Sequence, residues 1–194
     1  MNKAQLRKEY LQERKQLSQQ QLEELNEQLR NRLFPELTDQ KGLAHVFLPI
    51  QSKKEVDTWP VLEWLWAKGW DTCTSITHFE NNSLTHVLID EKSSFVENKW
   101  GVPEPINDRV VLPSEIDVVL IPMLCFDLNG HRVGYGKGYY DRFLSECRKE
   151  VVKIGLCTAE PVQEIRDASI HDMAMDMCIT PMQVYRFKKK NGRI

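Results

Sequence analysis

The sequence of 194 residues has few cysteines, and no two of them lie close together. They are odd in number and form no Cys-x-x-Cys pair; the five are Cys73, Cys125, Cys147, Cys157 and Cys178. A disulfide framework and a zinc site both need matched cysteines, so neither is indicated. We expect the thiols to be buried, because free cysteine behaves as a small apolar residue.

Long apolar runs and an excess of one charge are also missing. No apolar run approaches the roughly 20 residues that a membrane span needs, and the polar start MNKAQLRKEYLQERKQ differs from a secretory signal. The 26 basic and 28 acidic side chains give a formal net charge of -2, which leaves no general field for a nucleic-acid backbone. We therefore expect a cytoplasmic protein with neither a membrane nor a nucleic-acid partner.

The sequence does contain a regular alternation of helical and strand patterns. Helical leucine spacing covers the first third of the chain, and Ser18 with Gln21 forms a capping box that divides this region into two helices near Leu17. Further helices are predicted from Thr58 to Gly69, over 139–150 and after Thr158, and strands over 43–50, 72–79, 84–90, 117–126, 151–157 and 177–180. The almost continuous apolar run 117–126 is typical of a central strand that is covered on both faces.

This alternation predicts an α/β fold in which a single open, mostly parallel, twisted sheet carries helices on both faces, as in doubly wound proteins. We expect one domain over residues 1–194, because a chain of this length can bury about 70% of the surface that its unfolded form exposes. The basic end, residues 188–194, is predicted to be a frayed tail.

The segment FDLNGHRVGYGKGYYDRFL (126–144) lies between the predicted central strand and a helix, where ligands bind in open α/β sheets. Its alternating glycines allow the backbone to approach an anion, and the helix that follows offers free N–H groups. Two cations and a carboxylate that suits magnesium flank the glycines. The pattern favours a phosphate site formed by Arg132, Gly134, Gly136, Lys137, Gly138 and Asp141.

The spacing matches neither a Walker A loop nor the dinucleotide motif Gly-x-Gly-x-x-Gly. No Ser or Thr follows Lys137, and Gly138 comes one residue too early. On spacing alone, an ordinary glycine-rich turn is therefore as well supported as a phosphate site.

The longer segment IPMLCFDLNGHRVGYGKGYYDRFL resembles the signature of the 5-formyltetrahydrofolate cyclo-ligase family, also called methenyltetrahydrofolate synthetases. The resemblance covers nearly the whole chain. Outside the loop, the matching residues are Lys3, Leu6 and Arg7, Glu55 and Thr58, Trp100, Pro103 and Pro105, and Asp176. It implies a fold of the NagB/RpiA/CoA transferase-like kind.

The resemblance also implies a reaction. Magnesium-bound ATP would phosphorylate the formyl oxygen of 5-formyltetrahydrofolate, and ring closure would then give 5,10-methenyltetrahydrofolate with release of ADP and phosphate. Such a phosphoryl transfer needs positioning and charge neutralisation rather than a protein nucleophile. The absence of an evident Ser-His-Asp or Cys-His arrangement is thus no objection.

The roles that the resemblance implies fall into four groups. Catalytic residues are Arg132, Lys137 and Tyr140. ATP would be bound by Lys3, Arg7, Arg132, Gly134, Tyr135, Gly136, Lys137, Gly138, Tyr139 and Tyr140. Folate would be bound by Leu48, Glu55, Trp100 and Tyr139. The magnesium ligands would be Asp141 and Asp176.

Two features depart from the family pattern. Tyr135 stands between the first two glycines, where the family often has Arg or another polar residue, and residues 52–54 look like a small insertion. Lys53 or Lys54 could restore the missing positive charge. A non-catalytic folate-binding or nucleotide-binding module therefore remains an alternative, and a sugar-phosphate or CoA enzyme is a third. In each case we expect a monomer that acts on small molecules.

Overall fold

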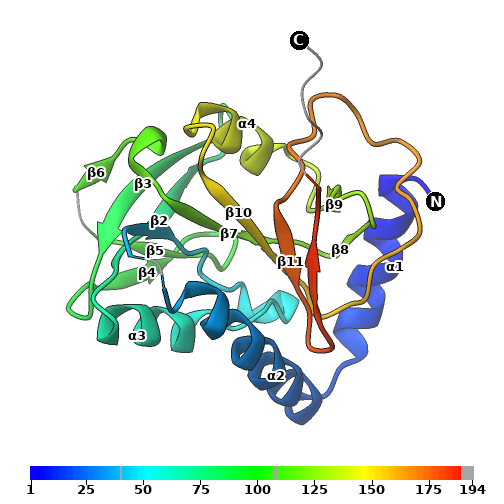
Figure 1. Cartoon of the computed structure of the whole chain (residues 1–194), viewed down its shortest axis with the longest axis horizontal. Helices are drawn as coiled ribbons and strands as arrows, with labels where there is room; N and C mark the ends of the chain where they lie inside the picture. Colours follow the sequence, from blue (N-terminus) through cyan, green and yellow to red (C-terminus); the bar gives the residue numbers. More distant parts are fainter. Residues whose placement is uncertain (40, 107–108, 189–194) are drawn as a thin grey trace.

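The structure, a computed structural model, describes residues 1–39, 41–106 and 109–188. Among these residues, the largest feature is an eight-stranded sheet in the order β12-β11-β10-β7-β1-β2-β3-β6 (Figure 1). Its strands are β1 (Leu43–His45), β2 (Asp71–His78), β3 (Ser83–Ile89), β6 (Val110–Val111), β7 (Val118–Pro122), β10 (Val152–Leu156), β11 (Met177–Ile179) and β12 (Val184–Arg186). Two small sheets pair β4 (Phe95–Glu97) with β5 (Pro103–Pro105), and β8 (Cys125–Phe126) with β9 (Arg132–Val133).

The centre of the large sheet is parallel. Strands β2, β1, β7, β10 and β11 run in one direction, whereas the pairings of β3 with β2 and β6, and of β12 with β11, are antiparallel. Parallel strands need crossover connections that cover the faces of the sheet. The predicted α/β fold with a mostly parallel sheet is therefore confirmed.

Helices cover both faces of this sheet (Figure 1). The helices are α1 (Lys3–Gln16), α2 (Gln19–Leu37), α3 (Trp59–Ala67) and α4 (Tyr139–Glu146), with short 3-10 turns η1 (Gln51–Lys53) and η2 (Pro113–Glu115). Along β7, Val118 and Leu120 belong to the core cluster shared with α2 and α3, whereas Val119 and Ile121 belong to the cluster shared with α4. Because successive side chains of a strand point to opposite faces, β7 is buried on both sides.

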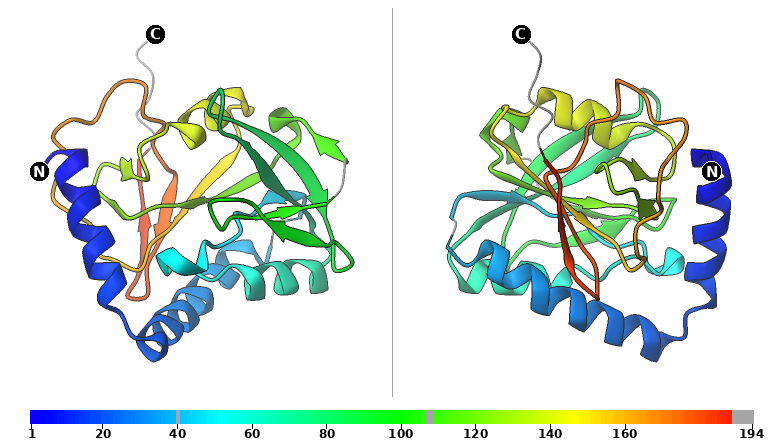
Figure 2. Two further views of the ribbon diagram at one scale, coloured as in Figure 1. Left: turned by 180° about the vertical axis from the view of Figure 1, so that it is seen from behind. Right: turned by 45° about the vertical axis from the view of Figure 1, so that its right-hand side comes forward.

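Helix α1 stands beside the small β8–β9 sheet rather than on a face of the large one (Figure 2). Its buried Leu6 packs with Cys125, Val133 and Ile165. Asn2 and Gln5 form a capping box at its start, and the backbone N–H of Arg166 donates to the carbonyl of Met1 at 3.1 Å. The first helix is thus fixed to segments that come much later in the chain.

Two of the predicted strands are wrong in length. The run 117–126 is divided, because the chain leaves the large sheet after Pro122 and the amide of Leu124 donates to Val133 in the small sheet at 2.8 Å. The predicted strand 43–50 ends at His45. The residues that follow remain buried but cannot continue the ladder past Pro49, which has no N–H.

The helix predicted after Thr158 is also wrong, since residues 158–176 form bends and turns. Several of their amides donate to distant partners: Val162 to Phe126 at 2.8 Å, Ile165 to Asp127 at 3.1 Å and Met173 to Asp141 at 3.2 Å. Tertiary hydrogen bonds therefore replace the helical ones in this segment.

Three smaller predictions have mixed outcomes. Thr58 is the N-cap residue of α3, but its hydroxyl donates to the carbonyl of Phe47 at 2.5 Å, and Asp57 accepts from the first helical amide instead. Cys147 is only partly buried, whereas the other four cysteines are buried as expected. In the predicted tail, residues 189–194 lie outside the described residues.

Within the described ranges, no helix combines the length and apolar character required to span a membrane.

Candidate active site

A pocket of about 580 Å³ lies where the central strands β1, β2 and β7 reach their carboxyl ends. All of the predicted site residues except Asp176 line it: Lys3, Arg7, Leu48, Glu55, Trp100, Arg132, Gly134, Tyr135, Gly136, Lys137, Gly138, Tyr139, Tyr140 and Asp141. Ligands in open α/β sheets bind at this edge. The sheet topology therefore brings together residues from both ends of the sequence.

The glycine loop, residues 134–138, connects β9 to α4 and forms one wall of the pocket. Gly136 and Gly138 have φ values of 89° and 70°, which favour glycine. A Cβ atom on Gly136 would lie 2.8 Å from Nη2 of Arg7, and Nε of Arg7 donates to the carbonyl of Gly134 at 2.8 Å. The loop can thus present its backbone, with the Arg7 guanidinium of α1 beside it, to an anion.

Arg132 and Asp141 form an ion pair at the start of α4. Nη2 of Arg132 lies 2.6 Å from Oδ1 of Asp141, and the Arg132 side chain is almost fully buried. Burial lowers the pKa of Arg132, although Asp141 and Asp172 oppose this effect. The amide of Met173 also donates to Oδ1 of Asp141 at 3.2 Å, so Oδ2 is the oxygen of Asp141 that is left for a ligand.

Asp172 is a pocket residue that the sequence analysis missed. Its Oδ2 accepts from Nζ of Lys3 at 2.5 Å and from the amide of Ser169 at 2.6 Å. Burial acts to raise the pKa of Asp172, but the hydrogen bonds from Lys3 and Ser169 outweigh it and the pKa is lowered. Asp172 therefore stays ionised, on the same side of the pocket as Arg132 and Asp141.

Asp176 lies away from the pocket. It precedes β11, and its Oδ2 accepts from the Lys153 amide at 2.9 Å and from Lys153 Nζ at 2.8 Å, at the amino end of β10. The structure thus brings Asp141 together with Asp172 and not with Asp176. Asp172 and Asp176 are four residues apart in DMAMD, and only the path of the irregular segment decides which one faces the site.

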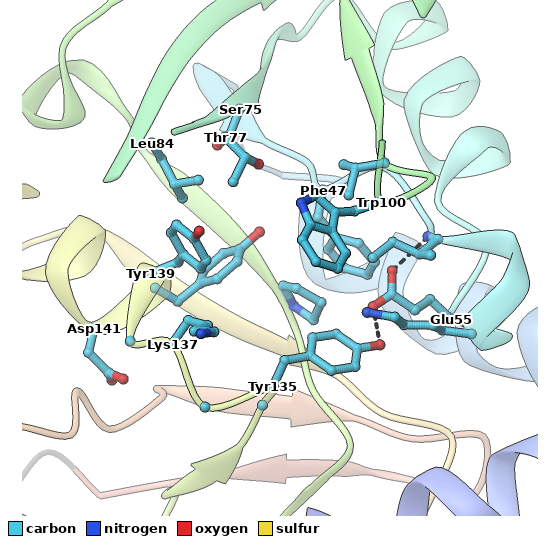
Figure 3. Close-up of a pocket in the computed structure, with 18 of the residues that line it drawn as sticks. Phe47, Glu55, Ser75, Thr77, Leu84, Trp100, Tyr135, Lys137, Tyr139 and Asp141 are labelled. Carbon is cyan, nitrogen blue, oxygen red and sulfur yellow. Dashed lines mark hydrogen bonds between the residues drawn. The ribbon is translucent and has the colours of Figure 1, made fainter. Parts of the chain in front are cut away.

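Apolar side chains and one buried carboxylate form the opposite wall (Figure 3). Leu48 is buried, and Glu55 is only 6% exposed. The Trp100 ring lies at the rim, 58% exposed and 5.7 Å from the ring of Phe79. A flat molecule with hydrogen-bond donors along one edge suits such a wall, because a carboxylate can accept two parallel N–H bonds.

Three further loop side chains differ in their surroundings. Lys137 is exposed and extends from the loop towards the pocket (Figure 3), and no carboxylate pairs with it among the described residues. Tyr139 lines the pocket, with the guanidinium carbon of Arg142 5.9 Å from its ring centroid. Tyr140 packs edge-on against His45, and burial raises the pKa of the Tyr140 hydroxyl well above its ordinary value.

The two lysines of the short insertion have separate environments. Nζ of Lys53 lies 4.1 Å from the centroid of the Tyr135 ring, and Lys53 lines the pocket. Nζ of Lys54 instead donates to the carbonyls of Lys15 and Leu17, at 2.8 and 2.5 Å, at the end of α1. Lys53 is therefore the lysine that adds positive charge next to Tyr135.

The carboxylates in the pocket fit magnesium held mainly by a bound phosphate. In the part of the chain that the structure describes, no three His, Cys, Asp or Glu side chains come together as a metal cage. Magnesium commonly keeps several waters and binds one or two carboxylates together with substrate phosphates. Asp141 and Asp172, which flank Arg132, meet that requirement beside the glycine loop.

Known proteins resemble this chain over most of its length. The model of the 5-formyltetrahydrofolate cyclo-ligase family matches residues 1–181. The 5-formyltetrahydrofolate cyclo-ligase of Escherichia coli K12 is 30% identical over 182 residues, which are 91% of this chain and 98% of that protein. The probable 5-formyltetrahydrofolate cyclo-ligase of Schizosaccharomyces pombe is 31% identical over 113 residues, 51% of this chain and 55% of that protein.

A solved structure gives the same result. The NMR structure of the 5,10-methenyltetrahydrofolate synthetase of Aquifex aeolicus is similar to this chain with a TM-score of 0.76 and 29% identity, over 100% of this chain and 96% of that one. Family model, sequence relatives and fold all agree. The chain belongs to the 5-formyltetrahydrofolate cyclo-ligase family.

Proposed function

We propose that the protein is an ATP- and magnesium-dependent enzyme that converts 5-formyltetrahydrofolate to 5,10-methenyltetrahydrofolate and acts in the cytoplasm as a monomer. Membership of the family indicates the cyclo-ligase activity itself. One observation supports the finer proposal: a single pocket has a cationic glycine loop on one wall and a buried carboxylate among apolar side chains on the other. ATP phosphates suit the first wall, and a folate ring suits the second.

In the proposed reaction, the formyl oxygen attacks the γ-phosphorus of ATP. The bond from that phosphorus to the bridging oxygen breaks, and ADP leaves with the electron pair. N10 of the folate then attacks the formyl carbon, whose oxygen now carries the phosphoryl group, and loses its proton; the bond from that carbon to the oxygen breaks, and phosphate leaves with the electron pair. The phosphoryl transfer needs the two ligands held close together in the correct orientation, and the ring closure needs N10 held next to the activated carbon; pre-organised binding groups provide both.

The roles on the phosphate side follow from the charges. Arg7, Lys53 and Lys137 have no carboxylate partner among the residues described, so their charge is available for ATP. Arg132 orients Asp141, Lys137 reaches the transferred phosphoryl group, and Tyr140 closes the pocket beneath it. Magnesium, when bound, would neutralise phosphate charge, with Asp141 and Asp172 rather than Asp176 as its protein ligands.

On the folate side, Glu55 would accept N–H bonds from the amino-pyrimidinone edge of the ring. Leu48 and Tyr139 would pack on the ring faces, and Trp100 would cover the entrance. Aromatic and aliphatic walls with a few polar groups are typical of such ligand sites.

Absorbance in the near ultraviolet tests the reaction directly, because the conjugated methenyl product absorbs where the substrate does not. Purified protein is mixed with 5-formyltetrahydrofolate, magnesium and ATP, and a parallel sample lacks ATP. We expect an ATP-dependent rise, with ADP and phosphate formed in equal amounts to the product. A flat trace from folded protein would overturn the proposal.

The alternative is a non-catalytic binding module on the same fold. Tyr135 supports it, because the family often has a cation or another polar residue at this position. The position of Lys53 over the Tyr135 ring weakens that argument by returning a positive charge to the loop. Tight binding of folate and ATP without any ATP consumption would favour the module.

A further inference from the structure

Tyr135 belongs to the glycine loop, but its side chain is directed to the opposite wall of the pocket. Its hydroxyl donates a hydrogen bond of 2.5 Å to Oε1 of Glu55, a residue 80 positions earlier in the chain (Figure 3). Gly134 and Gly136 flank it, so the backbone on either side belongs to the wall that suits phosphates. One residue therefore connects the two walls.

The carboxylate of Glu55 is held by few donors. The amide of Ile50 donates to its Oε2 at 2.7 Å, and within the described residues Tyr135 is the only side chain that donates to either oxygen. No salt bridge neutralises Glu55 in that part of the chain. Each carboxylate oxygen accepts two hydrogen bonds, so this arrangement leaves one acceptor position per oxygen for a ligand with two parallel N–H groups.

The surroundings of Tyr135 keep its hydroxyl a donor. Burial, followed by the neighbouring Glu55, raises the pKa of Tyr135 well above its ordinary value, and Arg14 of α1 only partly opposes this rise. The ring carries a second contact, because Nζ of Lys53 lies 4.1 Å from its centroid. The hydroxyl and the ring therefore serve two different neighbours and can be tested separately.

We propose that Tyr135 is a positioning residue: its hydroxyl orients the Glu55 carboxylate for folate and couples folate binding to occupation of the glycine loop by ATP. The proposal rests on the function proposed above. A ligand that orders the loop also fixes the Tyr135 hydroxyl, and hence Glu55, before the second ligand arrives. By linkage, folate must then raise the affinity for ATP by the same factor.

The first test is the substitution Tyr135→Phe, which removes only the hydroxyl and leaves the ring beneath Lys53. Titration calorimetry measures binding of 5-formyltetrahydrofolate and, separately, of a non-hydrolysable ATP analogue with magnesium. We expect the Kd for folate to rise about tenfold, as for loss of a hydrogen bond to a charged group, while the Kd for the analogue stays within about twofold. Equal weakening of both ligands, or an unchanged Kd for folate, would overturn the proposal.

The second test measures the coupling itself. Saturation of the wild-type protein with the ATP analogue should tighten folate binding about fivefold or more, within the ordinary range of coupling between sites, and Tyr135→Phe should abolish the difference. Glu55→Gln alone and combined with Tyr135→Phe complete a double-mutant cycle. If Tyr135 acts through Glu55, the combined variant binds folate no more weakly than Glu55→Gln. Additive losses would contradict that route.

Tyr185→Phe is the matched control. Its hydroxyl also donates to a glutamate, Oε2 of Glu160, at 2.5 Å, but neither residue lines the pocket. This variant should bind both ligands like the wild type. Because binding is measured without turnover, failure of the proposed function is distinguishable: folate binding without product formation removes only the reaction, whereas wild-type protein that binds no folate overturns both.

Discussion

His45 and His86 both contact Ser75, and His45 and Ser75 line the pocket. Nε2 of His45 lies 2.7 Å from Oγ of Ser75, and Nδ1 of His86 lies 3.1 Å from the same oxygen. Burial lowers the pKa of His45 well below its ordinary value, with His86 as a second cause, and lowers that of His86 to about 4. Both rings are therefore neutral at neutral pH, which spares the fold a buried charge.

For this reason the free energy of unfolding should become smaller as the pH is lowered. Between pH 6.5, the ordinary pKa of histidine, and pH 4, the unfolded chain binds a proton at His86 that the folded chain excludes, so His86 lowers the free energy of unfolding by about 1.4 kcal/mol for each pH unit of acidification. Above pH 6.5 neither state is protonated and the effect vanishes. Urea unfolding at pH 7.5 and 5.0 should therefore show a smaller difference for His86→Asn than for the wild type.

The exposed His171 provides the control for this comparison. His171→Asn should keep the pH dependence of the wild type, because this side chain lies at the surface and away from the His45–Ser75–His86 contacts. An equal pH dependence in His86→Asn and the wild type would show that His86 does not contribute.

Single substitutions also decide which aspartates serve magnesium. Asp141→Asn and Asp172→Asn should each raise the magnesium concentration for half-maximal turnover roughly tenfold or more, as loss of a metal ligand or its neighbour commonly does. Asp176→Asn should leave that concentration unchanged, because its carboxylate contacts Lys153 outside the pocket. A raised requirement in Asp176→Asn, with none in Asp172→Asn, would reverse the assignment.

At the scale of elements, α1 is held by side-chain hydrogen bonds at both of its ends, and its start lines the pocket. Lys3 and Arg7 reach Asp172 and Gly134 near its start, and Lys54 binds the last carbonyls at its end. A cation at a helix C-terminus also interacts favourably with the helix dipole. The insertion before Glu55 therefore supports the helix that carries two of the expected ATP contacts.

Lys54→Met tests this attachment. It keeps much of the side-chain length but removes both hydrogen bonds, so we expect the free energy of unfolding to fall by about 1 kcal/mol. Urea titration measures the change, and Lys92→Met, an exposed lysine in the turn after β3, should have almost no effect. Equal stability of Lys54→Met and the wild type would mean that these bonds add nothing measurable.

The sequence predicted correctly those helices and strands that are determined by neighbouring residues. Ser18 and Gln21 form the expected capping box of α2, and the apolar run at β7 is buried as predicted. The helix predicted within 158–176 was wrong because several amides of this segment donate to carbonyls and carboxylates of other segments. The spacing of apolar residues in a sequence does not reveal such long-range hydrogen bonds. The place of Asp172 in the pocket depends on that same path, whereas Asp176 was implied by the resemblance to the family and not by any local pattern.

At the scale of the whole molecule, the pocket is formed by segments from distant parts of the chain that meet at the carboxyl ends of the central strands. The residues after β1, the later part of β2 and the end of β7 form one side, and α1 with the glycine loop forms another. None of these segments encloses the pocket alone. Ligand binding should therefore be a property of the folded state only.

Ligands should accordingly stabilise the protein against urea. A ligand present at 100 times its Kd raises the free energy of unfolding by about 2.7 kcal/mol when it binds only the folded state. We expect this for 5-formyltetrahydrofolate and for the ATP analogue with magnesium. In Lys137→Ala, the effect of a fixed concentration of the analogue should shrink while the effect of folate persists.

Lys149→Ala, at an exposed lysine outside the pocket, is the control and should respond to both ligands as the wild type does. Full stabilisation of Lys137→Ala by the analogue would remove Lys137 from the phosphate site.

The docking of α1 on Cys125, Val133 and Ile165 has a consequence for biosynthesis. The helix leaves the ribosome long before these residues are made, and an isolated helix of 14 residues is marginal in water. It must wait as a loosely ordered segment until the chain beyond Ile165 emerges. Lys3 and Arg7 therefore reach the glycine loop only after Ile165 has emerged, so a nascent chain acquires its phosphate-binding wall later than the loop itself.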